Sequence, residues 1–170
     1  MASDIKSLGK FELGALVAGG VSILVSFIPK YVVVSIDGGK DIPGLSFSSG
    51  ISAWHGWAFL GMLLILAATA IVGVKAFAKE NLPDGVPWNL VAAAAAGLGT
   101  ILIIIRAFTV GDGGLGTVDV GPGWSGWLLF ITTIALTVFT FLSFKESGEK
   151  MPDLNKKNDT PPAPPAPPAA

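Results

Sequence analysis

Trp54-His55-Gly56-Trp57 is the stretch of sequence that decides the fold, because the chain repeats the pattern as Trp124-Ser125-Gly126-Trp127. Each copy opens a long apolar run. Each run ends close to adjacent basic and acidic residues, Lys79-Glu80 after the first copy and Lys145-Glu146 after the second. This agreement predicts that one structural unit occurs twice in the chain.

The composition places these apolar runs in a membrane. Hydrophobic residues make up 51% of the 170 residues and charged residues only 14%, a departure from soluble averages that long apolar runs explain. A helix of roughly 20 residues, rising about 1.5 Å per residue, spans a hydrocarbon core about 30 Å thick. Four runs with little charge are of about this length, 13–29, 57–74, 86–105 and 120–144. The sequence therefore predicts an all-α membrane protein with four transmembrane helices.

The predicted chain consists of a lead, a helical domain and a tail. Residues 1–11 form a cytoplasmic lead, 12–146 the four-helix transmembrane domain, and 147–170 a disordered Pro/Ala-rich cytoplasmic tail that favours polyproline II. Within the domain, the predicted helices and external loops have the following approximate bounds. The helices cover about 12–34, 54–77, 86–108 and 124–145, and the external loops cover 37–53 and 109–123.

The repeat extends upstream of both tryptophan pairs. Lys30 and then Asp37-Gly38-Gly39 precede the first copy, and Arg106 and then Asp112-Gly113-Gly114 precede the second. The helices that follow the two copies run in the same direction. The pattern therefore predicts two helical hairpins related by a pseudo-twofold axis along the membrane normal, a parallel repeat.

Lysines and arginines gather at one end of the predicted helices. Only Lys40 lies in an external loop, with Lys30 and Arg106 at the membrane edge of that side, and the other eight flank the opposite helix ends. The positive-inside rule then predicts a multi-pass protein of the inner (plasma) membrane with both termini in the cytoplasm. A secretory signal peptide is the alternative for the first run, but no small-x-small cleavage site follows it.

Several residues set local expectations inside this frame. Pro29 is expected to kink or end the first helix, and the β-branched residues 31–36 are expected to be extended. Five alanines from 92 to 96, followed by Gly97 and Gly99, predict a thin third helix at the centre of the bundle. On the fourth helix, three hydroxyl residues follow a helical spacing and are expected to face other helices. They are Thr133, Thr137 and Thr140.

The tryptophans are predicted to anchor the helix ends at the lipid headgroups, where amphipathic rings are favoured. These interface anchors are Trp54, Trp57, Trp88, Trp124 and Trp127. Lys30 and Arg106, the charges set within the apolar segments, lie near the outer interface and can snorkel to the headgroups. Alternatively, they bind lipid phosphate or form ion pairs with the repeated acids Asp37 and Asp112.

The sequence offers no constellation that predicts catalysis or a metal. His55 is the only histidine and there is no cysteine, so a metal site made by this protein alone is not expected. His55 is an interfacial polar residue, a pH-sensitive group, or one ligand of a metal or cofactor whose other ligand comes from elsewhere. The Asp-Gly-Gly sequences are typical of solvated turns, and they lack an EF-hand calcium pattern. We therefore expect no cofactor and no enzyme activity, and the charge distribution and the membrane topology exclude nucleic acid as a partner.

Taken together, four spans, small size, richness in alanine, glycine and valine, Trp-His-Gly-Trp at a re-entry point and a Pro/Ala tail resemble the small four-helix membrane proteins of unknown function from actinobacteria. The resemblance covers most of the chain. It implies an inner-membrane protein of a mycolic-acid or related bacterium, sometimes an accessory component of envelope-building or respiratory assemblies. It supplies no catalytic residues.

Two functions follow as expectations. The first is a non-catalytic accessory or scaffold subunit of a larger membrane complex, whose partners are membrane lipids and either a larger membrane protein complex or further copies of the chain. The alternative is a small oligomeric transporter or channel built around the hydroxyl row of the fourth helix. An enzyme dependent on His55 ranks third.

Overall fold

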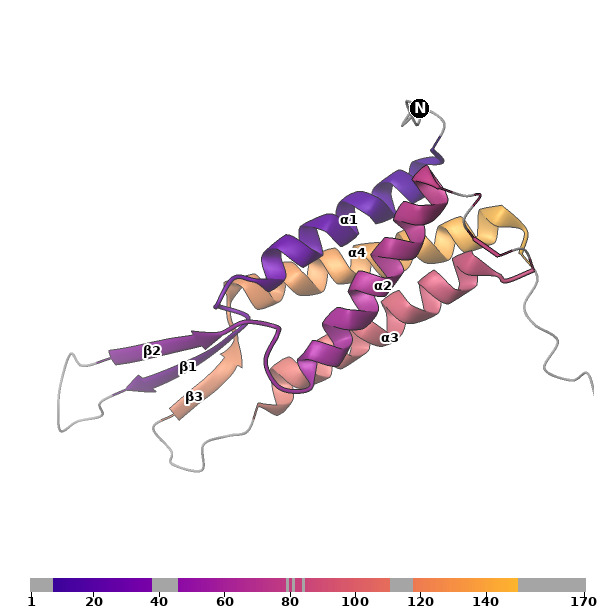
Figure 1. The fold of residues 1–170 in the computed structure, drawn as a ribbon. Coiled ribbons are helices and arrows are strands. Elements are labelled where there is room, and N and C mark those ends of the chain that lie inside the picture. Colours follow the sequence, from indigo (N-terminus) through magenta and orange to yellow (C-terminus); the bar gives the residue numbers. More distant parts are fainter. Residues whose placement is uncertain are drawn as a thin grey trace, which may run out of the picture.

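The fold is a bundle of four helices that carries a small sheet at one end (Figure 1). The computed structural model describes residues 8–37, 46–78, 80, 82–83, 85–110 and 118–149. Its elements in chain order are α1 (Lys10–Ser26), β1 (Val32–Asp37), β2 (Ser46–Ile51), α2 (Ala58–Phe77), α3 (Trp88–Thr109), β3 (Val118–Pro122) and α4 (Trp124–Ser147). The predicted third and fourth helices agree with α3 and α4 to within two residues at each end.

Within the residues that the structure describes, three helices are long and apolar enough to cross a membrane. α2 has 20 residues, α3 has 22 and α4 has 24. These lengths correspond to about 30 Å or more at the usual helical rise, which matches the hydrocarbon thickness. α1 is shorter, with 17 residues, or about 26 Å. The three long helices indicate a membrane protein, as the apolar runs predict.

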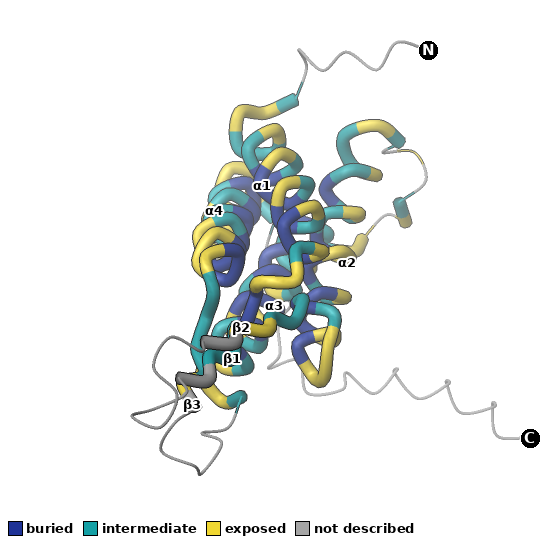
Figure 2. Tube along the Cα trace, turned by 90° about the vertical axis from the view of Figure 1, so that its left-hand side faces the viewer, coloured by how far each residue is buried: buried dark blue, intermediate teal, exposed yellow. Residues whose placement is uncertain are grey.

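The four helices form a ring in which each contacts two neighbours, in the order α1, α2, α3, α4. Their buried residues lie on the faces turned toward one another, and their exposed residues lie on the outward faces (Figure 2). Many of the exposed residues are large and apolar. In lipid, helices associate by close van der Waals packing because the surrounding acyl chains are equally apolar. The prediction that α3 lies at the centre is wrong, since α3, like each of the other helices, packs mainly against two neighbours in the ring.

Glycines bring α2 and α3 together. A Cβ atom built on Gly99 would lie 2.8 Å from the Gly61 carbonyl oxygen, and a Cβ built on Gly61 would lie 3.0 Å from the Gly99 carbonyl oxygen. The two backbones therefore touch without intervening side chains, as small residues at helix crossings permit. Gly99, one of the small residues predicted to promote close approach on the third helix, lies at this crossing.

The first helix is shorter than predicted, and the segment after it is a strand. α1 ends at Ser26, whereas the prediction continued to about residue 34. Pro29 lacks an amide hydrogen and disfavours helical geometry in the residue before it. β1 then begins at Val32, in agreement with the expectation that residues 31–36 are extended. The second helix also begins later than predicted, at Ala58 instead of residue 54.

The predicted external loops 37–53 and 109–123 contain strands that the all-α prediction did not include. β1 is the central strand and pairs antiparallel with β2 on one side and β3 on the other. Ser35 lies opposite Ser48 in β2 and opposite Asp119 in β3. Because β2 precedes α2 and β3 precedes α4, one sheet joins both connections at the same end of the bundle.

A short segment, residues 29–31, connects the bundle to this sheet, and we call it the junction segment. Three glycines pack against it so closely that Cβ atoms on Gly50, Gly123 and Gly126 would overlap its carbonyl oxygens. Tyr31 N–H donates a hydrogen bond to the Ile51 carbonyl at 3.0 Å, and Gly123 N–H donates to the Tyr31 carbonyl at 3.0 Å. Backbone contacts on both sides therefore hold the sheet firmly to the helices.

Candidate functional site

Polar side chains gather at both ends of the apolar bundle. The end that carries the first turn of α1 and the last turn of α4 holds a group of residues contributed by every helix, which we call the helix-end cluster. It consists of Glu12, Lys75, Asn89, Ser143 and Glu149. The other end, beside the sheet, holds the junction cluster, formed by Tyr31, Trp57 and Arg106.

Lys75 is the centre of the helix-end cluster. Its side chain, in the last turn of α2, is only 13% exposed, and its Nζ lies 3.2 Å from the Glu12 carboxylate on α1. Nζ also donates to the Asn89 side-chain carbonyl on α3, and Ser143 Oγ on α4 lies 3.5 Å from that same oxygen. A charge removed from water requires such partners. One connected set of polar contacts therefore ties four helices together.

Glu149 caps α3 from a distant part of the chain. Pro87 stands at the N-cap position of α3 and provides no side-chain cap. The Glu149 carboxylate instead accepts hydrogen bonds from Asn89 N–H at 3.0 Å, Leu90 N–H at 3.4 Å and the Asn89 side-chain amide at 2.9 Å. Gly148, with φ of 66°, turns the chain back at the end of α4. A carboxylate at this position satisfies exposed amide groups and complements the helix dipole.

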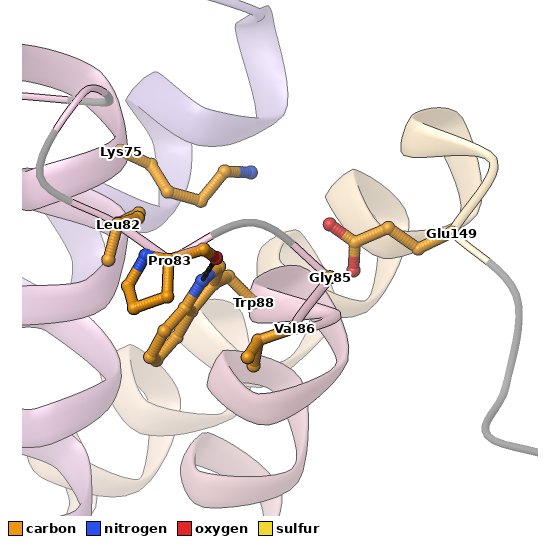
Figure 3. Close-up of a pocket in the computed structure, with 7 residues that line it drawn as sticks. All are labelled: Lys75, Leu82, Pro83, Gly85, Val86, Trp88 and Glu149. Atoms are coloured by element: carbon orange, nitrogen blue, oxygen red, sulfur yellow. Dashed lines mark hydrogen bonds between the residues drawn. The ribbon is translucent and has the colours of Figure 1, made fainter.

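Small cavities border the cluster. One of about 190 Å³ lies beside Lys75, Pro83, Trp88 and Glu149. Figure 3 shows the Lys75 ammonium and the Glu149 carboxylate reaching toward this space from different elements. A second, of about 200 Å³, lies between α1 and the end of α4. Both are below the volume of about 300 Å³ at which sites for drug-sized molecules begin.

The prediction that Lys30 and Arg106 are the charges within the apolar segments is wrong for Lys30, which lies beyond the end of α1, and it leaves out two charged residues. Lys75 lies inside α2 and Glu12 inside α1, and their side chains are 13% and 29% exposed. The one sequence feature that pointed to these contacts was a lysine, an asparagine and a glutamate in the terminal turns of three different helices. Sequence spacing cannot show that these turns meet, because the contacts join residues 14 and 63 positions apart.

The junction cluster contains the predicted Arg106, placed in the last turn of α3. Its guanidinium carbon lies 5.9 Å from the centre of the Trp57 ring, a cation–π arrangement. Gly56, with φ of 62°, leaves room for this guanidinium, since a Cβ there would lie 3.2 Å from it. Arg106 Nε is buried without a hydrogen-bond partner within the described residues. Its predicted ion pair with Asp112 falls outside the residues that the structure describes.

Tyr31 inserts between the helices from the junction segment. Its hydroxyl donates to the Ile103 carbonyl on α3. Tyr31 follows α1 in the sequence and belongs to none of the four helices. Burial raises the pKa of its phenol well above the ordinary value, and the nearby Arg106 lowers that pKa by a smaller amount. The phenol is therefore a neutral hydrogen-bond donor that joins the junction segment to α3.

The five tryptophans do not share one role. Trp124 and Trp127 are more than half exposed and Trp57 is 39% exposed, so for these three the role of interface anchor stays a prediction. Trp54 is half-buried, stacks on Phe27 at 5.3 Å and donates from Nε1 to Ser26 Oγ at 2.9 Å, so it packs the turn onto α1. Trp88 donates to the Pro83 carbonyl at 3.1 Å, which braces the connection between α2 and α3.

The remaining predicted site residues stand apart from both clusters. His55 is exposed, and its Nδ1 lies 3.2 Å from Ser52 Oγ. Lys30 is exposed in the junction segment. The Asp37 side chain, its predicted partner, lies outside the described residues. In the part of the chain that the structure describes, no three His, Cys, Asp or Glu residues come together as metal ligands would.

The hydroxyl row of α4 faces the interior of the bundle, as predicted. Thr133 and Thr140 are buried and donate to carbonyls one turn earlier in α4, Thr133 to Leu129 at 2.8 Å and Thr140 to Leu136 at 2.8 Å. Thr100 of α3 donates to the Thr133 carbonyl at 3.1 Å. The Thr100 hydroxyl therefore joins α3 to α4, whereas the Thr133 and Thr140 hydroxyls bond within α4.

The two tryptophan motifs differ in local structure. The first, with Gly56, forms a turn before α2, whereas the second, with Gly126, lies inside the first turn of α4. A strand precedes each motif, and both strands pair with β1. No protein-family model matches the sequence, and no curated protein is significantly similar to it.

Proposed function

We propose that this protein is a non-catalytic accessory or scaffold subunit of a larger membrane complex. The observation that carries the proposal is a sheet with two outward edges fixed to an apolar bundle through the junction segment. Unpaired strand edges are recognition surfaces, because an extended segment of another protein can add to them by backbone hydrogen bonds. The resemblance to small actinobacterial four-helix proteins supports a complex of envelope construction or respiration.

The proposal includes four spans in the inner membrane, with both termini cytoplasmic and the sheet outside. α1 lies alongside α2 and α4 and exposes Val17 and Leu24, although it has only 17 residues. Lys and Arg are concentrated at the end of the bundle that holds the helix-end cluster, and this supports the orientation. A strand before each tryptophan motif supports two related hairpins. The pseudo-twofold symmetry between them would be approximate, because the two motifs differ in local structure.

Cysteine labelling tests this orientation directly, because the chain has no native cysteine. In intact cells, a membrane-impermeant maleimide is expected to label Ser48→Cys in β2 and to leave Lys145→Cys at the other end of α4 unlabelled. Both positions are exposed. Permeabilised cells provide the control, since both variants should then react. Labelling of Lys145→Cys in intact cells would reverse the proposed orientation.

The β2 edge is the better docking edge of the two. β3 carries Asp119 and Pro122, residue types that shield a strand edge from pairing. β2 has the sequence Ser-Phe-Ser-Ser-Gly-Ile, without a charge or a proline. Ser48 and Asp119 both lie opposite Ser35, so they stand at the same level on the two edges. This correspondence provides matched positions for a test.

Affinity purification from the native membrane in mild detergent is expected to recover a stoichiometric partner. Ser48→Lys should reduce the recovered partner by about tenfold, since the charge at the β2 edge opposes strand addition. Asp119→Lys introduces the same side chain at the same level of the β3 edge and should retain the partner. Quantitative mass spectrometry of the eluates measures both. A protein that isolates alone contradicts the scaffold role, and equal losses in the two variants contradict docking at β2.

The hydroxyl row does not favour the alternative of an oligomeric channel. Thr133 and Thr140 are buried inside one molecule, and their hydroxyls bond to carbonyls of their own helix. A pathway between protomers would instead require polar groups on the outward face of α4. The described outward face carries Ile131, Ile134 and Val138, which are all exposed and apolar.

A further inference from the structure

A long apolar groove lies between α1 and α4, on the outside of the bundle. Its volume is about 520 Å³. Val17 and Val21 border it on α1, and Ile131 and Ala135 border it on α4. Phe139 lies against the backbone of α1 at Gly14, where an added Cβ would come within 3.1 Å of the ring. This contact gives the groove a smooth hydrocarbon floor.

The length of the groove matches one leaflet of a bilayer. On α1 it runs from Lys10 to Val21, which is about 16 Å at the usual helical rise. Half of a hydrocarbon core about 30 Å thick is about 15 Å. A partner helix would require a groove through the whole core. The shorter groove instead fits a single acyl chain that enters from one surface.

The end of the groove at the membrane surface carries a positive charge. Lys10, in the first turn of α1, lines that end and is exposed. Glu12, two residues along, forms an ion pair with Lys75. This is the one ion pair within 4.0 Å among the residues described. Within the groove the Thr132 hydroxyl is already satisfied by the Leu129 carbonyl at 3.1 Å. The lining therefore offers hydrocarbon contact along its length and a cation at its mouth.

We propose that this groove binds one anionic phospholipid, with an acyl chain along α1 and α4 and the phosphate beside Lys10. The ammonium contributes Coulombic attraction to the anionic headgroup, and the apolar lining contributes contact with the chain. The site differs from the sheet end, where Lys30 and Arg106 lie. The inference depends on membrane insertion and not on the scaffold role, so each can fail independently.

Native mass spectrometry of the delipidated full-length protein in detergent tests the proposal. The probes are dioleoyl phosphatidylglycerol, which is anionic, and dioleoyl phosphatidylcholine, which is zwitterionic with the same chains. The wild-type protein is expected to retain one phosphatidylglycerol in preference to phosphatidylcholine. Lys10→Gln should weaken phosphatidylglycerol binding about fivefold and leave phosphatidylcholine binding unchanged. Val17→Trp, which fills the groove, should weaken binding of the anionic lipid about tenfold or more.

Matched controls separate the groove from the general surface. Lys145→Gln removes an exposed lysine at the same end of the bundle, outside the groove. Leu24→Trp adds the same indole on α1 at a position that is 72% exposed and beyond the groove. Both controls should bind phosphatidylglycerol like the wild type, and circular dichroism should show equal helicity in all variants.

Three results would overturn the proposal. Equal retention of the two lipids by the wild type would show that Lys10 does not select the headgroup. An equal loss in Val17→Trp and Leu24→Trp would indicate loosely held lipid around the whole bundle. A dimer that disappears in Val17→Trp while lipid retention stays constant would assign the groove to a second copy of the chain.

Discussion

Gly126→Ala is expected to lower the free energy of unfolding by about 3 kcal/mol. The added methyl group would overlap the Tyr31 carbonyl oxygen, which is backbone and cannot move away as a side chain could. The junction segment or the first turn of α4 must then shift. Because Tyr31 of that segment is hydrogen-bonded to Ile51 of β2 and to Gly123, the residue that follows β3, the shift disturbs the attachment of the sheet. Alanine at a helical position otherwise stabilises by about 1 kcal/mol, so the sign of the change is diagnostic.

Gly20→Ala is the matched control for this substitution. Gly20 is also helical, in α1, and a Cβ there would meet no other atom within 4 Å. Unfolding of the purified protein by increasing mole fractions of SDS, followed by circular dichroism, measures both variants. Gly20→Ala should unfold at the same or a higher SDS fraction than the wild type. A Gly126→Ala protein as stable as Gly20→Ala would show that the junction segment is not tightly enclosed.

Gly99→Val is expected to have the second large effect, again about 3 kcal/mol of lost stability. Its Cβ would lie 2.8 Å from the Gly61 carbonyl oxygen and 3.1 Å from the Leu64 Cβ, both on α2. The branched side chain then pushes α2 and α3 apart along a crossing where their backbones touch. In lipid, no hydrophobic effect pulls the two helices back together, because acyl chains cover the separated surfaces equally well.

Gly97→Val, two residues earlier on α3, provides the control. A Cβ at this position would lie 3.6 Å from the Thr137 methyl group, an ordinary contact. It should cost about 1 kcal/mol or less, and the same SDS titration can compare the two variants. Equal stability of the two variants would contradict a backbone contact at Gly99.

The same glycine in the two tryptophan motifs is required for different reasons. Gly56 adopts a left-handed backbone with φ of 62° and leaves space for Arg106. Gly126 is helical and leaves space for the Tyr31 carbonyl. The letters repeat because both motifs begin an apolar helix beside the sheet. Only the three-dimensional neighbours distinguish a conformational need from a steric one.

The sequence by itself determined that there are long apolar helices, and it determined the bounds of two of them. Apolar runs of bilayer length are a local property, so the bounds of α3 and α4 could be predicted to within two residues, and Pro29 together with Val32–Val34 already indicated an extended segment after the first helix.

Only the tertiary structure decided which terminal turns meet and which extended segments pair. The ion pair of Lys75 with Glu12, the cap that Glu149 provides for α3, and the register of β1 with β3 each join residues far apart in the chain. No periodicity marks such partners, because each residue alone is only a polar group near a helix end or a β-branched residue after a turn. They are chosen when close helix packing removes the polar groups from water and each must find the partner that the bundle brings within reach.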